Sequence, residues 1–151
     1  SASAGRWLHD TVEPQKWCVT KRDLRFLRSM VSEEVRTGRI CQHARDRFDP
    51  SDDVVGPSMY TVVDQYIRPL TERAGGMSWA LLINPRGLTC DLFITHCWAE
   101  GIFEFIDKVL HSWPGGKKHA YVCALSNPQN LDIGHLLCVP RCSPFARALG
   151  A

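Results

Sequence analysis

Apolar residues in the first part of the chain recur at the spacing of an α-helix. The first stripe consists of Leu24, Leu27, Val31 and Val35, with Phe26 and Met30 beside it. Thr20-Lys21-Arg22-Asp23 precedes this stripe and resembles a capping box, with an N-cap threonine and an acid at the third helical position. Gly38 is a suitable stop. The pattern therefore predicts a helix between Thr20 and Gly38.

A second helical stripe follows Pro57. Its members fall at the i, i+3, i+4, i+7, i+8 and i+11 positions and are Met59, Val62, Val63, Tyr66, Ile67 and Leu70. Pro69 is expected to kink or end this helix, because its ring clashes with the preceding turn. Gly75-Gly76 closes the segment, and residues 39–57 read as a polar loop. Residues 1–76 are thus predicted to form a helical N-terminal region.

The period of the pattern changes after Ser78. Trp79–Ile83 is predicted to be a short strand, and residues 84–87 a turn into a second strand over Leu88–Thr95. So short a turn cannot hold a parallel crossover, so these two strands should pair antiparallel. Residues 102–113 predict an amphipathic helix, and His119–Leu125 a third strand.

Strand, helix and strand over residues 88–125 predict a parallel βαβ unit. The expected fold class is therefore α/β, with a small mixed sheet whose central strand is 88–95, and with the helical region 1–76 packed on the unit formed by residues 77–151. A chain of 151 residues suits one compact domain made of both parts. Ser143-Pro144 predicts the start of a short last helix through Leu149.

Polar and reactive side chains follow both strands of the predicted βαβ unit. The first cluster is Thr95, His96, Cys97, Trp98 and Glu100, and the second is Ser126, Asn127 and Gln129. Carboxyl ends of parallel strands meet at one rim of a sheet, which is where ligands bind in open α/β folds. We therefore expect both clusters at a common rim and take their members as ligand-binding candidates.

Each candidate also has a plain structural interpretation. Trp98 could stack on a nucleotide base with Glu100 beside it, or Trp98 could cap the sheet end while Glu100 satisfies amides at a helix N-terminus. His96 and Cys97 could act as base and nucleophile, although adjacent strand residues point to opposite faces. The loop of Ser126, Asn127 and Gln129 could hold a ribose or phosphate, or simply form a turn. No catalytic residue is assigned.

The segment Asp91-Leu92-Phe93-Ile94-Thr95-His96 resembles the first conserved box of Toll/interleukin-1 receptor-like (TIR-like) domains, in which an Asp precedes an apolar strand ending in Ile-Ser-His or Ile-Ser-Tyr. The similarity covers residues 88–150, the first half of such a domain. It implies a flavodoxin-like fold and either TIR–TIR assembly or cleavage of nicotinamide nucleotides, with NAD as the ligand. The second box is not visible. No residue matches the family's catalytic glutamate, and that role is not transferred to Glu100.

The cysteine pattern bears on redox state and metal binding. Seven cysteines, an odd number, indicate reduced thiols inside a cell rather than a disulfide framework. His135, Cys138 and Cys142 are weak zinc candidates, with Cys123 or His119 as a fourth ligand. Structural zinc normally uses two tight ligand pairs, which this spacing lacks, so no metal is expected.

Composition and charge narrow the function classes. The chain is 44% hydrophobic with a net charge of +2, which describes a globular protein without the dense basic face of a nucleic-acid-binding domain. It shows no signal-peptide pattern and no apolar run that could span a bilayer. An open edge at strand 119–125 and five tryptophans favour a protein interaction or scaffolding module in the cytoplasm or an organelle, binding a protein partner or itself. The alternatives are a TIR-like NAD-hydrolysing fragment and an accessory subunit of an organelle complex.

Overall fold

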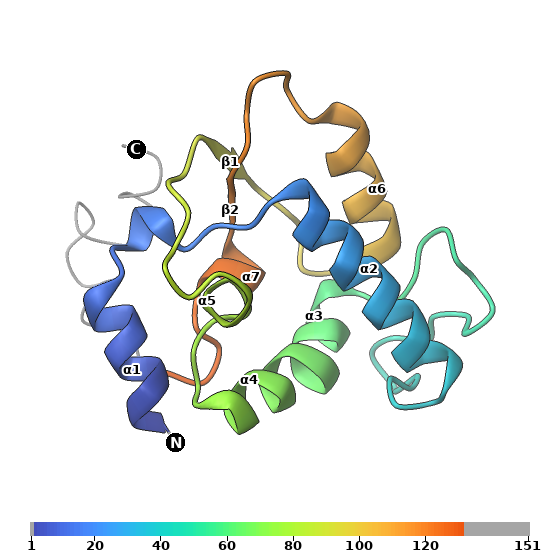
Figure 1. Cartoon of the computed structure of the whole chain (residues 1–151). Helices are drawn as coiled ribbons and strands as arrows, with labels where there is room; N and C mark the ends of the chain where they lie inside the picture. Colours follow the sequence, from blue (N-terminus) through green and yellow to red (C-terminus); the bar gives the residue numbers. More distant parts are fainter. Residues whose placement is uncertain (1, 132–151) are drawn as a thin grey trace.

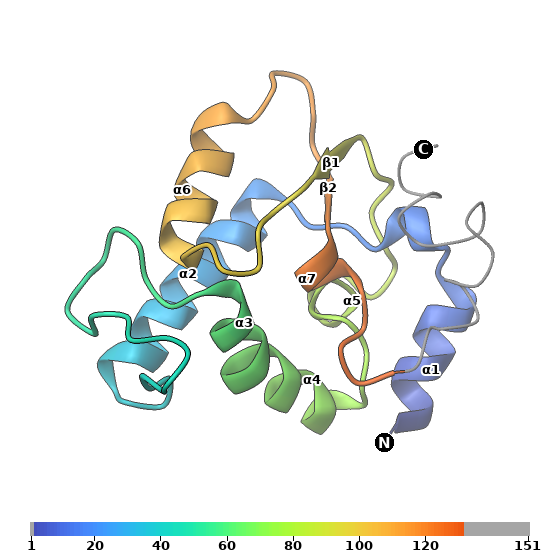
Figure 2. The same cartoon turned by 180° about the vertical axis from the view of Figure 1, so that it is seen from behind.

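The computed structural model describes residues 2–131, in which helices surround a short parallel sheet (Figures 1 and 2). The elements in chain order are α1 (Ala2–Thr11), η1 (Pro14–Lys16), α2 (Lys21–Arg36), α3 (Met59–Val62), η2 (Val63–Ile67), α4 (Arg68–Ala74), α5 (Trp79–Ile83), β1 (Leu92–Ile94), α6 (Ile102–Ser112), β2 (Ala120–Val122) and α7 (Cys123–Ser126). Helices α2 and α6 pack together beside the sheet, whereas α1 lies on the opposite side. The predicted last helix through Leu149 lies outside the described residues.

Helix α2 forms as its sequence predicts. The Thr20 side chain accepts from the Asp23 N–H at 3.1 Å, and the Asp23 carboxylate accepts from the Thr20 N–H at 2.9 Å. This complete capping box satisfies two amides that the first turn leaves free. The four stripe residues, Leu24, Leu27, Val31 and Val35, are buried.

The second predicted helix runs through Pro69 to Ala74. The helix does not end at Pro69. The π-helical turn η2 ends two residues before this proline, and the Arg68 N–H bonds back to the Val63 carbonyl. Such a widened turn is a known way for a helix to tolerate proline, because it changes the hydrogen-bond register where the ring lacks an N–H. Gly75 ends the helix with a φ of 124°, a conformation that favours glycine.

The sheet within residues 2–131 contains two parallel strands, so the chain has a mixed α/β architecture. Leu92 pairs with Ala120, Phe93 with Tyr121 and Ile94 with Val122, and α6 makes the crossover. The strand–helix–strand order is confirmed, although both strands are shorter than predicted.

The predicted strand Trp79–Ile83 is wrong, and with it the antiparallel pairing and the mixed sheet with 88–95 at its centre. This segment is helix α5, capped by the Ser78 hydroxyl, which accepts from the Leu81 N–H at 3.1 Å. A short apolar run suits a buried helix as well as a buried strand, and periodicity alone cannot separate the two. The N-cap serine favours the helix.

Two apolar clusters lie against the sheet. The larger contains the buried faces of α2, α3 and α6, with Leu92 and Ile94 packed on it. The smaller includes Trp17 and Tyr121, and Phe93 packs on it with its ring stacked on Tyr121. Strand β2 is buried throughout. Its predicted open edge is covered at Ala120, because the backbone of Val19 exchanges hydrogen bonds of 2.9 and 2.8 Å with that residue. Among the described residues, no helix has the length and apolar character needed to cross a membrane.

Candidate functional site

The loop after β1 and helix α7, which directly follows β2, meet at one end of the sheet. His96 Nε2 accepts from the Ala124 N–H at 3.3 Å, which joins the first loop to α7. The His96 ring also contacts Trp98 edge-on, with centroids 5.1 Å apart, and contacts Phe105 of α6 in the same way. The predicted common rim is therefore present.

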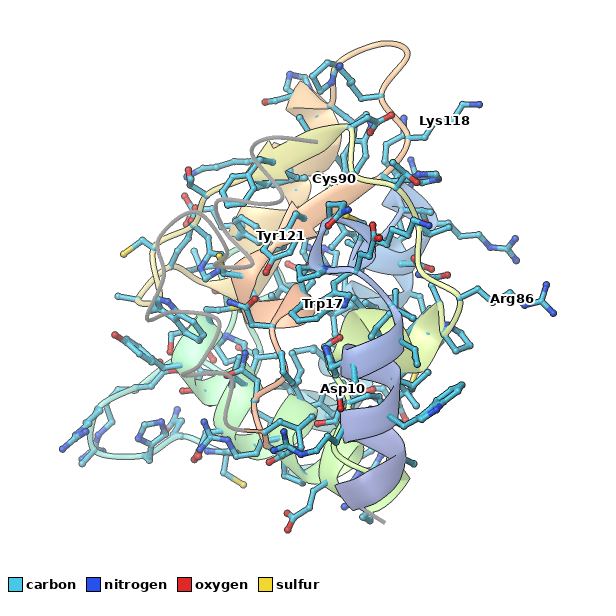
Figure 3. All side chains as sticks on the ribbon, turned by 90° about the vertical axis from the view of Figure 1, so that its left-hand side faces the viewer. Asp10, Trp17, Arg86, Cys90, Lys118 and Tyr121 are labelled. Carbon is cyan, nitrogen blue, oxygen red and sulfur yellow. The ribbon has the colours of Figure 1, made fainter. Side chains whose placement is uncertain are left out.

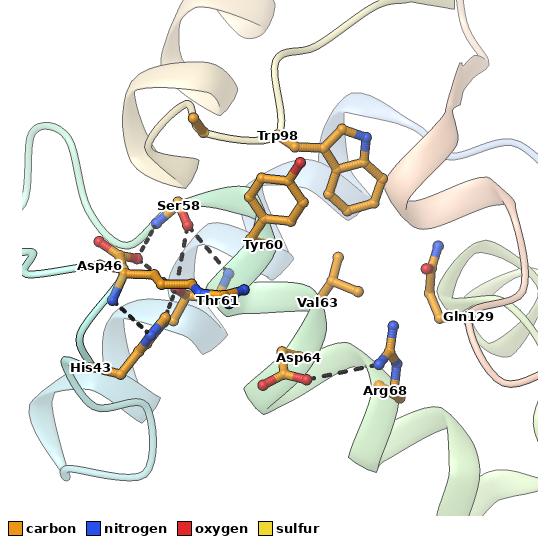
Figure 4. A pocket seen from close by; sticks show the side chains of 12 residues that line it. His43, Asp46, Ser58, Tyr60, Thr61, Val63, Asp64, Arg68, Trp98 and Gln129 are labelled. Atoms are coloured by element: carbon orange, nitrogen blue, oxygen red, sulfur yellow. Dashed lines mark hydrogen bonds and ion pairs between the residues drawn. The ribbon is translucent and has the colours of Figure 1, made fainter.

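An open cavity of about 860 Å³ lies at this rim (Figure 4). The rim loops contribute Trp98, Ala99 and Gln129 to its lining. The rest of the lining comes from the polar loop around residues 43–46 and from the helical segment 58–68. The site therefore joins the βαβ unit to the helical N-terminal region.

The cavity has an aromatic wall. Tyr60 and Trp98 stack with centroids 5.3 Å apart and ring planes at 28°. The Tyr60 N–H donates to the Trp98 carbonyl at 3.1 Å, so backbone pairing holds the two rings in register. Tyr60 is 61% exposed, which leaves aromatic surface open to a ligand. Figure 4 shows both rings beside the cavity, with Val63 below them.

A hydrogen-bond chain fixes the far end of the cavity. The Arg45 N–H donates to His43 Nδ1 at 3.4 Å, so Nε2 carries the proton and donates to the Thr61 hydroxyl at 2.9 Å. Thr61 donates to Asp46 Oδ2 at 2.5 Å, and the Ser58 N–H donates to the same oxygen at 2.9 Å. Burial favours a raised pKa for Asp46, but these hydrogen bonds outweigh it and leave the pKa below its usual value.

This chain is better suited to positioning than to catalysis. Thr61 is buried, and the Ser58 hydroxyl caps α3 by accepting from the Thr61 N–H at 3.3 Å. Neither hydroxyl is a free nucleophile beside a free base, which nucleophilic catalysis requires. The network holds the loop around His43 against the start of the helix.

Two guanidinium groups line the cavity. Arg68 lies 3.8 Å from Asp64, and both side chains are exposed, at 48% and 73%. Arg45 is exposed and has no ion-pair partner within residues 2–131. Exposed pairs of this length contribute little, so Arg68 can turn toward an anionic ligand at small cost.

Of the first predicted cluster, only Trp98 lines the cavity. His96 packs behind Trp98 with a pKa lowered by burial, a shift that Glu100 partly opposes. Thr95 and Cys97 are exposed and lie outside the lining. Glu100 also lies outside it and accepts from Lys108 at 3.2 Å.

The second predicted cluster contributes one lining residue. The Gln129 side chain faces the cavity, and its amide donates to the Ala124 and Asn127 carbonyls at 3.2 Å each. Ser126 is fully buried, where its hydroxyl accepts from the Val122 N–H at 3.0 Å. Asn127 accepts from the Tyr121 hydroxyl. Ser126 and Asn127 therefore stabilise the chain after β2.

The part of the site contributed by residues 43–68 was not predicted from the sequence. Tyr60 carried a usable signal, because it lies off the apolar stripe of its helix and so places an aromatic ring at the surface. His43, Arg45 and Asp46 carried none, since their loop reads only as polar. Their position depends on long-range hydrogen bonds to Ser58 and Thr61.

The zinc candidates His135, Cys138 and Cys142 lie outside the described residues. Over residues 2–131, no group of three His, Cys, Asp or Glu side chains is arranged to hold a metal ion. His119 Nδ1 hydrogen-bonds to the Thr89 carbonyl at 2.9 Å, and Cys123 is half-buried with a pKa raised by burial.

Comparisons of this chain with models of protein families, with curated proteins and with solved structures gave no match. The cavity itself combines a stacked aromatic pair with two cationic side chains in one open space.

Proposed function

We propose that this protein binds a nucleotide in the rim cavity. The observation that carries the proposal is the pairing of the Tyr60–Trp98 wall with the guanidinium groups of Arg45 and Arg68 in a single cavity of about 860 Å³. Ligand sites commonly span about 300–1,000 Å³ and combine apolar walls with a few polar groups. A planar base and an anionic phosphate are the chemical groups that complement these two features.

The aromatic wall is the base-binding element of the proposal. The ligand's base stacks on the exposed part of the wall, where Tyr60 and Trp98 are already stacked on each other and lose little side-chain entropy on binding. Stacking of a base on an aromatic side chain contributes about 1–3 kcal/mol by alanine substitution. The Gln129 carbonyl oxygen remains available for a base N–H.

The two arginines are the phosphate-binding element. Guanidinium groups bind phosphate oxygens in a bidentate way, and Arg45 has no ion pair to give up among the described residues. Two carboxylates also line the cavity. Asp46 accepts hydrogen bonds from Thr61 and Ser58 at Oδ2, which hold it in place, whereas Asp64 is the exposed partner of Arg68 and can turn to solvent.

The likeness of Asp91–His96 to the first TIR-like box makes nicotinamide nucleotides members of the proposed ligand class, together with the flavodoxin-like fold that the likeness implies. Binding is proposed without turnover. Glu100, the acid in the loop after β1, lies outside the cavity lining and is paired with Lys108 of α6. The free thiols among the described residues support a reducing, intracellular location.

Calorimetric titration of the full chain with AMP, ADP and NAD tests the proposal, with adenosine and inorganic phosphate as partial ligands. We expect Trp98→Ala to weaken nucleotide binding about 10–100-fold. The matched control is Trp7→Ala, since Trp7 is 64% exposed on α1 and lies outside the cavity lining. Arg68→Gln should weaken nucleotide binding but leave adenosine binding unchanged. Equal affinities of the two tryptophan variants, or no heat with any nucleotide, would contradict the proposal.

A protein interaction module is the second candidate. Val54 and Val55 are adjacent on one loop and are 65% and 43% exposed, which is unusual for apolar side chains and is typical of contact surfaces. Light scattering after size-exclusion chromatography tests self-association. A wild-type chain that remains monomeric at high concentration would count against self-association, and a Val54→Ser, Val55→Ser double variant should disrupt any dimer that this loop forms.

A further inference from the structure

Two buried cysteines far apart in the sequence come together beneath the sheet. Cys18 lies between η1 and α2 and has no exposed surface, and Cys90 lies just before β1 and is 5% exposed. Both belong to the smaller apolar cluster, with Trp17 and Tyr121. Figure 3 shows Cys90 above Tyr121 and Trp17 on this side of the molecule.

Backbone hydrogen bonds hold the two cysteine segments side by side. The Cys90 N–H donates to the Gln15 carbonyl at 2.8 Å on one side of Cys18. On the other side, Val19 exchanges two hydrogen bonds with Ala120 of β2. One flank of Cys18 is thus anchored to the segment that carries Cys90 and the other to the neighbouring strand β2, and the two thiols lie within hydrogen-bonding reach of each other. A disulfide requires such proximity.

The two thiols are not equivalent. A hydrogen bond from Cys18 is the largest influence on Cys90 and lowers its pKa to about 6, with the Leu92 and Tyr121 backbones acting in the same direction against burial. The same hydrogen bond, together with burial, raises the pKa of Cys18. The pair therefore favours Cys90 as the attacking thiol and Cys18 as the partner that keeps its proton.

We propose that Cys18 and Cys90 form a reversible dithiol–disulfide site that is oxidised by hydroperoxides. The Cys90 sulfur attacks the hydroperoxide oxygen, the O–O bond breaks, and the leaving alkoxide or hydroxide takes up a proton. Cys18 then attacks the resulting sulfenic sulfur, forming the S–S bond while the S–O bond breaks and water leaves with the Cys18 proton. Two thiols and one hydroperoxide give one disulfide, one alcohol or water from the peroxide, and one water.

Oxidation would tie the segment before α2 to the start of β1. The link closes a long loop of the chain, so the chain-entropy model predicts a more stable oxidised form, with a melting temperature about 5–10 °C higher. This site is separate from the rim cavity and does not depend on its function.

Peptide mapping of the full chain, treated with hydrogen peroxide and digested without reduction, tests the proposal. We expect a Cys18–Cys90 linked peptide, lighter by two hydrogens and restored by dithiothreitol, to appear before oxidation of the exposed Cys41 and Cys97. The proposal is overturned if Cys18 and Cys90 stay reduced while those exposed thiols oxidise, or if Cys90 pairs with another cysteine.

Thermal unfolding of variants gives a second readout. The peroxide-induced rise in melting temperature should be present in wild type and in the exposed-site control Cys97→Ser. It should be absent in Cys18→Ala and in Cys90→Ala. A rise that persists in both alanine variants would overturn the proposal. If either alanine variant does not fold, the wild-type peptide map decides alone.

Discussion

Gly101 connects the rim loop to α6, and its substitution by alanine is the sharpest test of how the cavity is built. Its φ of −67° and ψ of 137° suit any residue, so backbone conformation does not demand glycine here. Space does. A Cβ at this position would lie 2.2 Å from the Val55 carbonyl oxygen and 2.5 Å from Val55 Cγ1.

The cost of Gly101→Ala can be worked from the hydrogen bonds around the contact. The Glu100 carbonyl accepts from Met59 at 2.9 Å, the Ile102 N–H donates to Pro57 at 2.8 Å, and the Phe103 N–H donates to Val55 at 3.0 Å. Relief of the clash requires a movement of about 1 Å, which stretches two or three of these bonds beyond their normal range. At about 1 kcal/mol each, the free energy of unfolding should fall by about 2–4 kcal/mol, and the melting temperature by roughly 5–10 °C.

Thermal unfolding followed by circular dichroism measures this loss. Gly115→Ala is the matched control, because a Cβ there meets nothing within 4 Å. Gly101→Ala should also weaken nucleotide binding, since the same loop places Trp98 on Tyr60. If the two alanine variants melt at the same temperature, the close backbone approach at Gly101 is not a condition of the fold, and the account of the cavity fails.

Three further predictions concern the scaffold. Thr20→Ala removes the capping box of α2 and should cost about 1 kcal/mol in urea unfolding, whereas Thr20→Ser should retain most of it. Burial lowers the pKa of His9 from 6.5 to about 4, so the unfolded chain takes up a proton at this residue at a higher pH than the folded chain does. The free energy of unfolding should therefore fall by on the order of 3 kcal/mol as the pH drops from about 6.5 to about 4. His9→Gln should flatten that slope in acid titrations. Arg28 makes a bidentate, partly exposed ion pair with Asp107. A double-mutant cycle with Arg28→Met and Asp107→Asn should give a coupling free energy of about 1 kcal/mol, which high salt reduces. Zero coupling at low salt would refute a stabilising role for this ion pair.

Local signals in the sequence determined α2, the helical segment from α3 to α4, α6 and the order of the βαβ unit. The Thr20 capping box and the stripe beginning at Leu24 specify α2, because both the donor pattern and the apolar spacing are satisfied within one helix. The apolar face of residues 102–112 likewise specifies α6. Two parallel strands joined by a helix end at the same rim of the sheet. The common rim after β1 and β2 can therefore be predicted without knowing any tertiary contact.

Tertiary contacts decided the rest. Trp79–Ile83 suited strand and helix equally by pattern, and it became α5 where Ser78 could cap it within the buried core. The cavity needed Tyr60 to meet Trp98, and the dithiol needed Cys18 to meet Cys90. Each of these pairs is distant along the chain, so its geometry depends on backbone hydrogen bonds between segments that only folding brings together. Periodicity and capping report on neighbours within a few residues, and they carry no information about such encounters.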